Sequence, residues 1–426
     1  MAIGWTARTA LVDKVIDRER LRRIADGLAV ALACSLPWST SATGIIAGLW
    51  LITLVPTLEP AALRRAIKTP AGGLPVLLWA LGLAGMLWAD VPIIEQLHGL
   101  GAFHKLLCIP LLMAQMQRAD RPAGWILATF LASCTALLVV SFALLVFPRM
   151  PWLPTTMPGI PVKNYAAQSE LFTICIFALA EFTRQNWRRS RPDLTLATAA
   201  LAALFLINVL LVATTRTVLV VLPLLLVLFG FRCWRWRGAL LSLAGVGAVA
   251  MAAWFASPFF QVRVGSFMTE VHEYQTANLR NSAGERLEFW KKSIGFVTQA
   301  PWIGHGTGSI ADQFRRTAGD EGGASAVVSS NPHNQTLAIA IQLGLLGTAV
   351  LFALWAAHLW LFRGMALAAW IGFVVVMQNV VGSLFNSQLF DFTHGWAYVI
   401  GVGVCGGAML GRIGRASRST GAPPAP

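Results

Sequence analysis

Charged side chains are scarce in this chain: only 12% of its 426 residues are Asp, Glu, Lys or Arg, whereas 56% are hydrophobic. A soluble globular domain carries roughly twice that share of charge. The apolar residues gather in runs of about twenty, which is the length of a membrane-spanning helix. The alternating pattern of a transmembrane barrel strand is absent. We therefore predict an all-α, polytopic integral membrane protein.

Cysteine and acidic residues are also few, with 6 Cys and 19 Asp plus Glu. No cysteine falls in the long polar segment 257–332, so the sequence indicates neither a disulfide framework nor a metal-binding spacing. Asp312, Asp320 and Glu321 lie in a Gly-rich stretch without the spacing of a Mg²⁺ or Mn²⁺ site. We expect no metal and no cofactor. A cleavable signal is not evident either, because the first twenty or so residues are charged rather than apolar.

The apolar runs predict about twelve spans, with a mildly polar interfacial segment at 90–104. The spans are expected at 24–38, 42–58, 74–89, 105–117, 124–147, 166–182, 194–213, 218–231, 239–256, 334–360, 365–385 and 395–411. This divides the chain into four parts. They are 1–256 with nine spans and a basic N-terminal segment, a large, partly helical loop at 257–332, three further spans in 333–411, and a tail at 412–426.

The net charge of +14 could suggest a nucleic-acid-binding protein, but membrane topology explains it better. Twelve spans place both termini on one side, and the short loops of that side carry most of the Lys and Arg, including a basic loop around Arg64. The positive-inside rule makes that side cytoplasmic. We expect the basic N-terminus to contact membrane lipids and the long loop to face outward, with no nucleic acid as partner.

The stretch Asn331-Pro332-His333-Asn334-Gln335 lies where the long loop meets an apolar run. We expect Asn331 to cap a helix and Pro332 to occupy its first turn. His333 would then lie at the positive end of the helix dipole, which disfavours the imidazolium form. A neutral imidazole near pH 7 can accept a proton. The alternative is an ordinary histidine at the water interface.

Two further polar sites are expected on the same outer side. Arg216 lies in a four-residue turn between two apolar runs, where an arginine is costly unless it has a function or snorkels to the interface. Lys163 and Asn164 end a proline-rich loop and begin a helix. Their alternative roles are an interface anchor and a helix cap.

Arg286 lies in the long loop, in a segment where Ser282 and Glu285 have the spacing of a capping box that opens a helix. Neighbouring acidic residues make a surface ion pair its alternative role.

Taken together, these sites predict several cations and one neutral imidazole near the lipid head groups. The guanidinium fork fits phosphate oxygens, so two arginines and a lysine suit a diphosphate. A neutral histidine beside them suits a general base that deprotonates a hydroxyl. The predicted chemistry is attack by an alcohol on a carbon whose leaving group is a lipid diphosphate, with arginines in place of a metal.

The motif His333-Asn334, nine residues, Gly344, two residues, Gly347 resembles the signature of the O-antigen ligase family, within the wider O-antigen ligase and polymerase superfamily. The span pattern with a large loop before the tenth span is similar over essentially the whole chain. Arg216 resembles the family's arginine at an outer turn, and Arg286 resembles its arginine in the long-loop helix.

The resemblance implies a C-type glycosyltransferase-like fold in the bacterial inner membrane, with both termini cytoplasmic and the active site facing the periplasm. It implies transfer of a glycan from undecaprenyl diphosphate to lipid A–core, with inversion and without metal or nucleotide. His333 would be the base, and Arg216 and Arg286 the diphosphate ligands. Lys163, Asn164, Asn334 and Gln335 would contact substrate.

Three other functions stay open. An O-antigen polymerase and a protein O-oligosaccharyltransferase of the same superfamily would share the donor chemistry. A lipid-linked oligosaccharide flippase or solute transporter would instead favour ionisable groups near the bilayer midplane, whereas most charges here lie at span ends. The sequence assigns no role to Asp391 and His394, and His305 is the next candidate base.

Overall fold

The computed structural model describes residues 17–118, 121–147, 157–256, 258–319 and 322–420. Every regular element within these ranges is a helix, which confirms the predicted all-α class. The basic segment 1–16, the acidic pair Asp320 and Glu321, and residues 421–426 of the predicted tail lie outside the described residues.

The N-terminal part of the bundle follows the predicted apolar runs closely. Its helices are α2 (Arg18–Ser35), α3 (Thr40–Leu54), α4 (Pro60–Lys68), α5 (Pro70–Ala84), α6 (Ile93–His104), α7 (Cys108–Met116) and α8 (Arg121–Val146). The basic loop around Arg64 is in fact helix α4. It forms because Pro60 suits a first helical turn, and because Ala62 and Ala66, one turn apart, bury a common face.

The second half of the bundle surrounds the predicted long loop. Its helices are α9 (Tyr165–Arg188), α10 (Pro192–Leu211), α11 (Arg216–Ala256), α15 (Gln335–Leu361), α16 (Leu367–Gly382) and α17 (Phe392–Thr420). Helix α11 is interrupted at Trp234 and Arg235, whose backbone angles are not helical. This break separates the two apolar runs that were predicted as the eighth and ninth spans.

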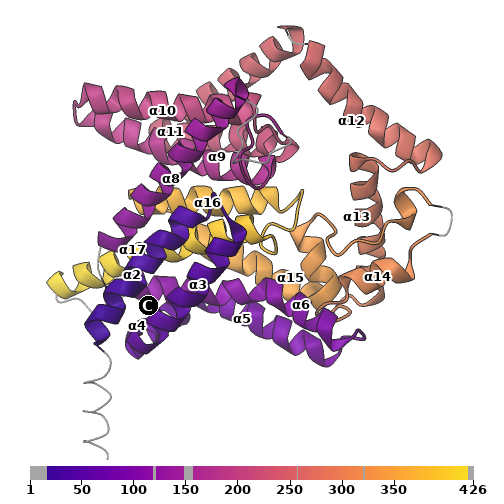
Figure 1. Cartoon of the computed structure of the whole chain (residues 1–426), viewed down its shortest axis with the longest axis horizontal. Coiled ribbons are helices and arrows are strands. Elements are labelled where there is room, and N and C mark those ends of the chain that lie inside the picture. The colour runs from indigo at the N-terminus through magenta and orange to yellow at the C-terminus, as the bar shows by residue number, and fades with distance from the viewer. Residues whose placement is uncertain (1–16, 119–120, 148–156, 257, 320–321, 421–426) are drawn as a thin grey trace, which may run out of the picture.

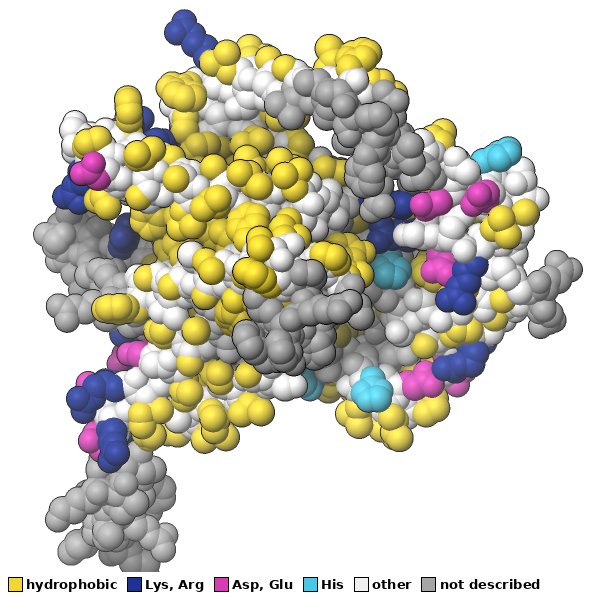
Figure 2. All heavy atoms as spheres, turned by 45° about the horizontal axis from the view of Figure 1, so that its top comes forward, with side chains coloured by type: hydrophobic (Ala, Val, Ile, Leu, Met, Phe, Trp, Pro, Cys, Tyr) yellow, Lys and Arg dark blue, Asp and Glu magenta, His cyan; other side chains and the backbone are white. Residues whose placement is uncertain are grey.

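Eight helical stretches of the described chain are long and apolar enough to cross a membrane, and Leu367–Gly382 is a shorter apolar helix. One of the eight, Ile93–Met116, joins the expected interfacial segment to the expected short fourth span. Hydrophobic side chains cover the broad middle of the face in Figure 2, and charged side chains gather toward its two ends. This is the surface of a polytopic membrane protein; the count of twelve stays a prediction.

The predicted loop 257–332 is largely helical. It contains α12 (Pro258–Ala277), α13 (Ser282–Gln299), α14 (Ile310–Arg316) and a short 3₁₀ turn. Its small core joins Phe289, Phe296 and Phe314 to Ala338 and Ile341 of α15. In Figure 1 these loop helices lie at the end of the molecule opposite the start of α2 and the end of α17.

Helix α15 is broken at Gly344, which has a φ of +61°. The peptide groups freed by the break are paired with the segment that follows α13. Leu345 donates its N–H to the carbonyl of Pro301, at 2.7 Å, and the carbonyl of Ile341 accepts the N–H of His305, at 2.8 Å. Such pairing stabilises a break in a membrane helix, because a backbone group without a partner is costly in lipid.

The motif glycine Gly344 is required by this geometry for two reasons. Its positive φ is costly for residues with a side chain. In addition, a Cβ at this position would lie 2.5 Å from the carbonyl oxygen of Trp302. The break therefore explains one of the two glycines in the motif, and it ties the loop helices to the membrane bundle.

Candidate active site

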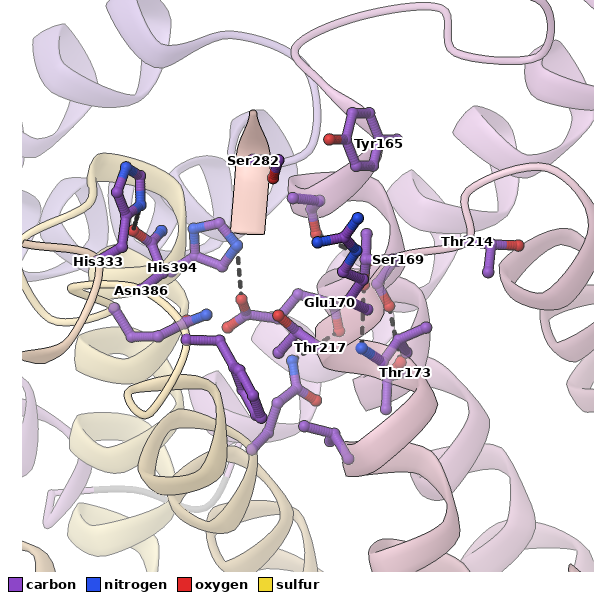
Figure 3. Close-up of a pocket in the computed structure, with 18 of the residues that line it drawn as sticks. Tyr165, Ser169, Glu170, Thr173, Thr214, Thr217, Ser282, His333, Asn386 and His394 are labelled. Carbon is purple, nitrogen blue, oxygen red and sulfur yellow. Dashed lines mark hydrogen bonds and ion pairs between the residues drawn. The ribbon is translucent and has the colours of Figure 1, made fainter. Parts of the chain in front are cut away.

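A cavity of about 410 Å³ opens between the membrane helices and the loop helices. Its walls come from the start of α9, the start of α11, the start of α13, the segment before α15, the end of α16 and the start of α17. Arg216, Arg286 and His333 all line it. Figure 3 shows it with His333 and Asn386 on one side, Thr214 on the other, and Glu170 between them.

His333 is positioned by a turn that precedes α15. The expected cap was wrong: α15 begins at Gln335, and its N-cap is Asn334, which accepts the N–H of Leu337 at 3.1 Å. Asn331 instead accepts the backbone N–H of His333 at 2.8 Å. This local bond favours a turn over a helix. His333 itself has a φ of +52°.

The His333 ring is held from two sides. Its Nδ1 lies 3.2 Å from the Oδ1 of Asn386, which also accepts a hydrogen bond from the side chain of Asn331 at 3.0 Å. A carboxamide oxygen can only accept, so Nδ1 carries the proton and Nε2 keeps its lone pair. Phe289 of α13 stacks on the opposite side, with ring centroids 6.0 Å apart.

The charge state of His333 suits a proton acceptor. Burial lowers the pKa of His333 from its usual 6.5, and the positive charge of Arg286 lowers this pKa further, while the hydrogen bond with Asn386 opposes the shift. The imidazole is therefore mostly neutral at pH 7. The sequence predicted this state, but from the helix dipole; burial and a neighbouring arginine are the larger causes.

Arg216 is the first residue of α11, where the Thr215 hydroxyl accepts the N–H of Val218 and caps the helix. Its guanidinium pairs with Glu270 of α12 at 2.8 Å, and its side chain is one-third exposed. Glu270 also accepts the N–H of Ala283 at 3.0 Å, so it links Arg216 to the start of α13.

Arg286 lies in the first turns of α13. The predicted capping box was wrong here as well: the N-cap is Asn281, which accepts the N–H of Gly284, and Glu285 pairs with Arg280. No carboxylate in the described part of the chain forms an ion pair with Arg286, so the expected surface pair does not form. Burial and the charge of Arg216 lower the pKa of Arg286, although it remains a cation.

The pocket thus combines two guanidinium groups with one neutral imidazole. A half-buried arginine without a carboxylate partner in the described structure, beside a second arginine, is a ready site for an anion with several oxygens. A lone pair on His333 Nε2 can take a proton from a hydroxyl in the same space. The sequence had predicted these three residues on one side of the membrane, and the structure brings them to one cavity.

Four other residues that the sequence proposed for substrate binding lie outside this cavity. Lys163 donates hydrogen bonds to the carbonyl of Leu36 and the hydroxyl of Thr393, and burial lowers its pKa to about 8. Asn164 caps α9. Asn334 caps α15, and Gln335 is fully buried, with its carbonyl oxygen accepting the N–H of Leu389. Their binding roles stay predictions.

The sequence missed several residues of the pocket. Glu170 of α9 and His394 of α17 face one another across its floor (Figure 3), and Gln378 and Gln388 also line the cavity. An acidic residue within a predicted span is a signal that could have identified Glu170. His305, the second candidate base, lies outside the lining, with its ring bonded to the carbonyl of Phe296.

A family model described as O-Antigen ligase matches residues 201–352, a segment that contains Arg216, Arg286, His333 and Gly344. No curated protein matches the chain significantly.

Proposed function

Because residues 201–352 of this chain belong to the O-antigen ligase family, we propose that the protein is a glycosyltransferase that moves a glycan from undecaprenyl diphosphate to a sugar hydroxyl of lipid A–core. The family match supports assignment to the O-antigen ligase and polymerase superfamily of membrane enzymes. We propose the donor, the acceptor and a role for each of the site residues.

Arg216 and Arg286 would bind the diphosphate of the donor. Both line the cavity, and Arg286 has no ion-pair partner among the described residues. As the bond between the anomeric carbon and the phosphate oxygen breaks, negative charge grows on the diphosphate. Two fixed guanidinium groups stabilise that charge without reorganising.

His333 would act as the general base. Its Nε2 takes the proton of the acceptor hydroxyl while that oxygen attacks the anomeric carbon from the side opposite the diphosphate. One bond forms and one breaks at the same carbon, so the configuration inverts. Asn386 contributes by holding the proton on Nδ1, which keeps the lone pair of Nε2 directed away from it.

The observation that supports this proposal most directly is the shared cavity of Arg286 and His333. The same arginine that is available to an anion also lowers the pKa of His333 and keeps it neutral. One residue therefore favours both donor binding and base function. A flippase would not need a neutral base beside its anion site.

The proposed function implies a topology for the chain in the membrane. We propose twelve spans in the bacterial inner membrane, with both termini in the cytoplasm and α12 to α14 in the periplasm. The loop helices lie at the end of the molecule away from both described ends of the chain (Figure 1). The long loop 257–332 would then form an outer unit above the spans of 1–256 and 333–411, with 412–426 as a cytoplasmic tail.

The decisive experiment is reconstitution of the purified protein in liposomes with a lipid-linked glycan and, in separate reactions, lipid A–core, a second lipid-linked glycan or an acceptor protein. We expect a glycan–lipid A–core product, formed equally well in excess EDTA. A glycan polymer would identify a polymerase, a modified protein an oligosaccharyltransferase, and movement of the donor without any new bond a flippase. Loss of activity in EDTA that Mg²⁺ restores would contradict the arginine-based leaving-group chemistry.

A further inference from the structure

The floor of the cavity contains a carboxylate that the proposed reaction does not use. Glu170 lies in the second turn of α9, and its side chain is only 10% exposed. Its Oε2 lies 2.7 Å from the Nε2 of His394. Its Oε1 accepts no hydrogen bond from any residue within the described ranges, and Glu170 lines the cavity. One oxygen of this carboxylate is therefore held while the other is available to a ligand.

His394 is itself held by a second carboxylate. Its Nδ1 lies 2.6 Å from the Oδ1 of Asp391, and its side chain is 6% exposed. His394 therefore lies between two carboxylates, with a hydrogen bond to Asp391 and a close contact to Glu170. Glu170, His394 and Asp391 form a chain of side-chain contacts that orients the Glu170 carboxylate.

Two lysines lie against this chain. Lys105 donates hydrogen bonds to the backbone carbonyls of Phe390 and Asp391. Lys163 donates to the hydroxyl of Thr393. Both ammonium groups offset the negative charge of the chain and fix the backbone that carries Asp391 and His394. This gives Lys163 a supporting role rather than direct contact with a ligand.

A carboxylate in this cavity restricts what can lie against it. It would repel a diphosphate, so Glu170 does not belong to the anion site of Arg216 and Arg286. Sugar hydroxyls are neutral donors that a carboxylate oxygen binds well. Gln378 and Gln388 also line the cavity, are each 4% exposed, and have buried carboxamide oxygens without a hydrogen-bond partner in the described structure. Together with Glu170, these acceptor groups suit a ligand rich in hydroxyl groups.

The connection between α16 and α17 links this floor to the base. Asn386 in the connection bonds to His333, and Asp391 at its end holds His394, which holds Glu170. The same backbone segment therefore positions the base and the carboxylate. The hydroxyl that gives its proton to His333 belongs to the acceptor.

We propose that Glu170, oriented by His394 and Asp391, binds hydroxyl groups of the acceptor sugar and sets its position beside His333. The inference rests on the proposed function, because it assigns a subsite of the same pocket. Glu170 is a binding residue in this account, and His394 and Asp391 are positioning residues that act through it.

The test uses steady-state transfer by the full-length protein in liposomes, with donor and acceptor concentrations varied separately. We expect Glu170→Gln to raise the KM for the acceptor at least tenfold and to leave the KM for the donor within twofold. The acidic limb of the pH profile should not move, since His333 remains the base. Glu95→Gln is the matched control, because Glu95 lies outside the cavity and pairs with Arg315 on the surface.

Gln388→Leu provides a second variant that removes a carboxamide without changing the charge, and it should raise the acceptor KM severalfold. An unchanged acceptor KM in both variants, or an equal rise in donor and acceptor KM, would overturn the subsite. A shift of the acidic limb in Glu170→Gln would make Glu170 the base and overturn it too. A wild-type protein that transfers no glycan would instead overturn the proposed function, and the subsite with it.

Discussion

Replacing Arg286 by lysine separates the charge of this residue from its geometry. The lysine keeps one positive charge beside His333, so the low pKa of the imidazole should persist. What is lost is the planar fork that binds two phosphate oxygens at once. Arg286 is better suited to this test than Arg216, since it has no ion pair with a described carboxylate whose loss would complicate the result.

The expected loss of transfer rate can be estimated from the loss of the bidentate guanidinium contact alone. One charge-assisted contact that strengthens as the leaving group departs is worth about 2–4 kcal/mol in the transition state. Because about 1.4 kcal/mol corresponds to a factor of ten, the rate should fall roughly 30- to 1000-fold. The side chain is buried enough to shift its own pKa, so solvent screening reduces this figure less than it would at an exposed site.

The assay is the single-turnover rate of glycan transfer in liposomes at matched protein levels. Arg280→Lys is the control, because Arg280 lies just before α13, is 68% exposed and pairs with Glu285. Such an exposed pair is worth about 0–1 kcal/mol, so its replacement should leave the rate unchanged. Equal rates for wild type, Arg280→Lys and Arg286→Lys would refute bidentate binding of the diphosphate by Arg286.

Five further outcomes are expected. His333→Ala should lower transfer at least roughly 100-fold without changing membrane insertion or the elution volume of the purified protein, and near-normal turnover would exclude it as the base. Because the neutral form of His333 is the active one and its pKa is lowered, kcat/KM should rise with pH to a plateau with a midpoint below 6.5. Arg286→Gln should raise the pH midpoint of the residual activity, because it removes the positive charge that lowers the pKa of His333. An unchanged pH midpoint would contradict this effect of Arg286 on His333. Glu270→Gln should remove the ion pair between this residue and the pocket arginine and lower the donor KM up to about fivefold, whereas a higher KM would mean that the pair positions this arginine. Gly344→Ala should lower the thermal midpoint in detergent by several degrees relative to Gly245→Ala, where a Cβ meets nothing within 4 Å, and equal midpoints would contradict the strain at the break.

The helices, and the position of the site residues on one side of the membrane, could be predicted from the sequence for simple physical reasons. Apolar runs of span length must be helical in lipid, so the predicted segments coincide with helices. Charge bias in short loops placed Arg216, Arg286 and His333 on one side, and three polar residues at one interface of a bundle have few places to meet. The structure shows them in one cavity.

The predicted helix caps were wrong where tertiary contacts outweigh the local preferences of the sequence. Asn331 and Asn334 are equally good caps in isolation, but Asn331 is bonded to Asn386, more than fifty residues away, and this keeps the chain in a turn. The sequence did not identify Glu170 as a site residue for a similar reason. Its partner His394 follows it by more than two hundred residues, and nothing local indicates that the two side chains meet.

The break at Gly344 has a consequence for the biosynthesis of the protein and for where its chain can be truncated or exchanged. The peptide groups on either side of the break are paired by residues 301–306, which are synthesised before α15. If that segment were absent, α15 would enter the bilayer with exposed N–H and C=O groups, each costing several kcal/mol in lipid. The outer helices are therefore not a detachable module. A truncated chain that lacks them should fail to assemble its last spans, and a chimaera that exchanges the outer helices between relatives must keep residues 301–306 with the α15 they fit.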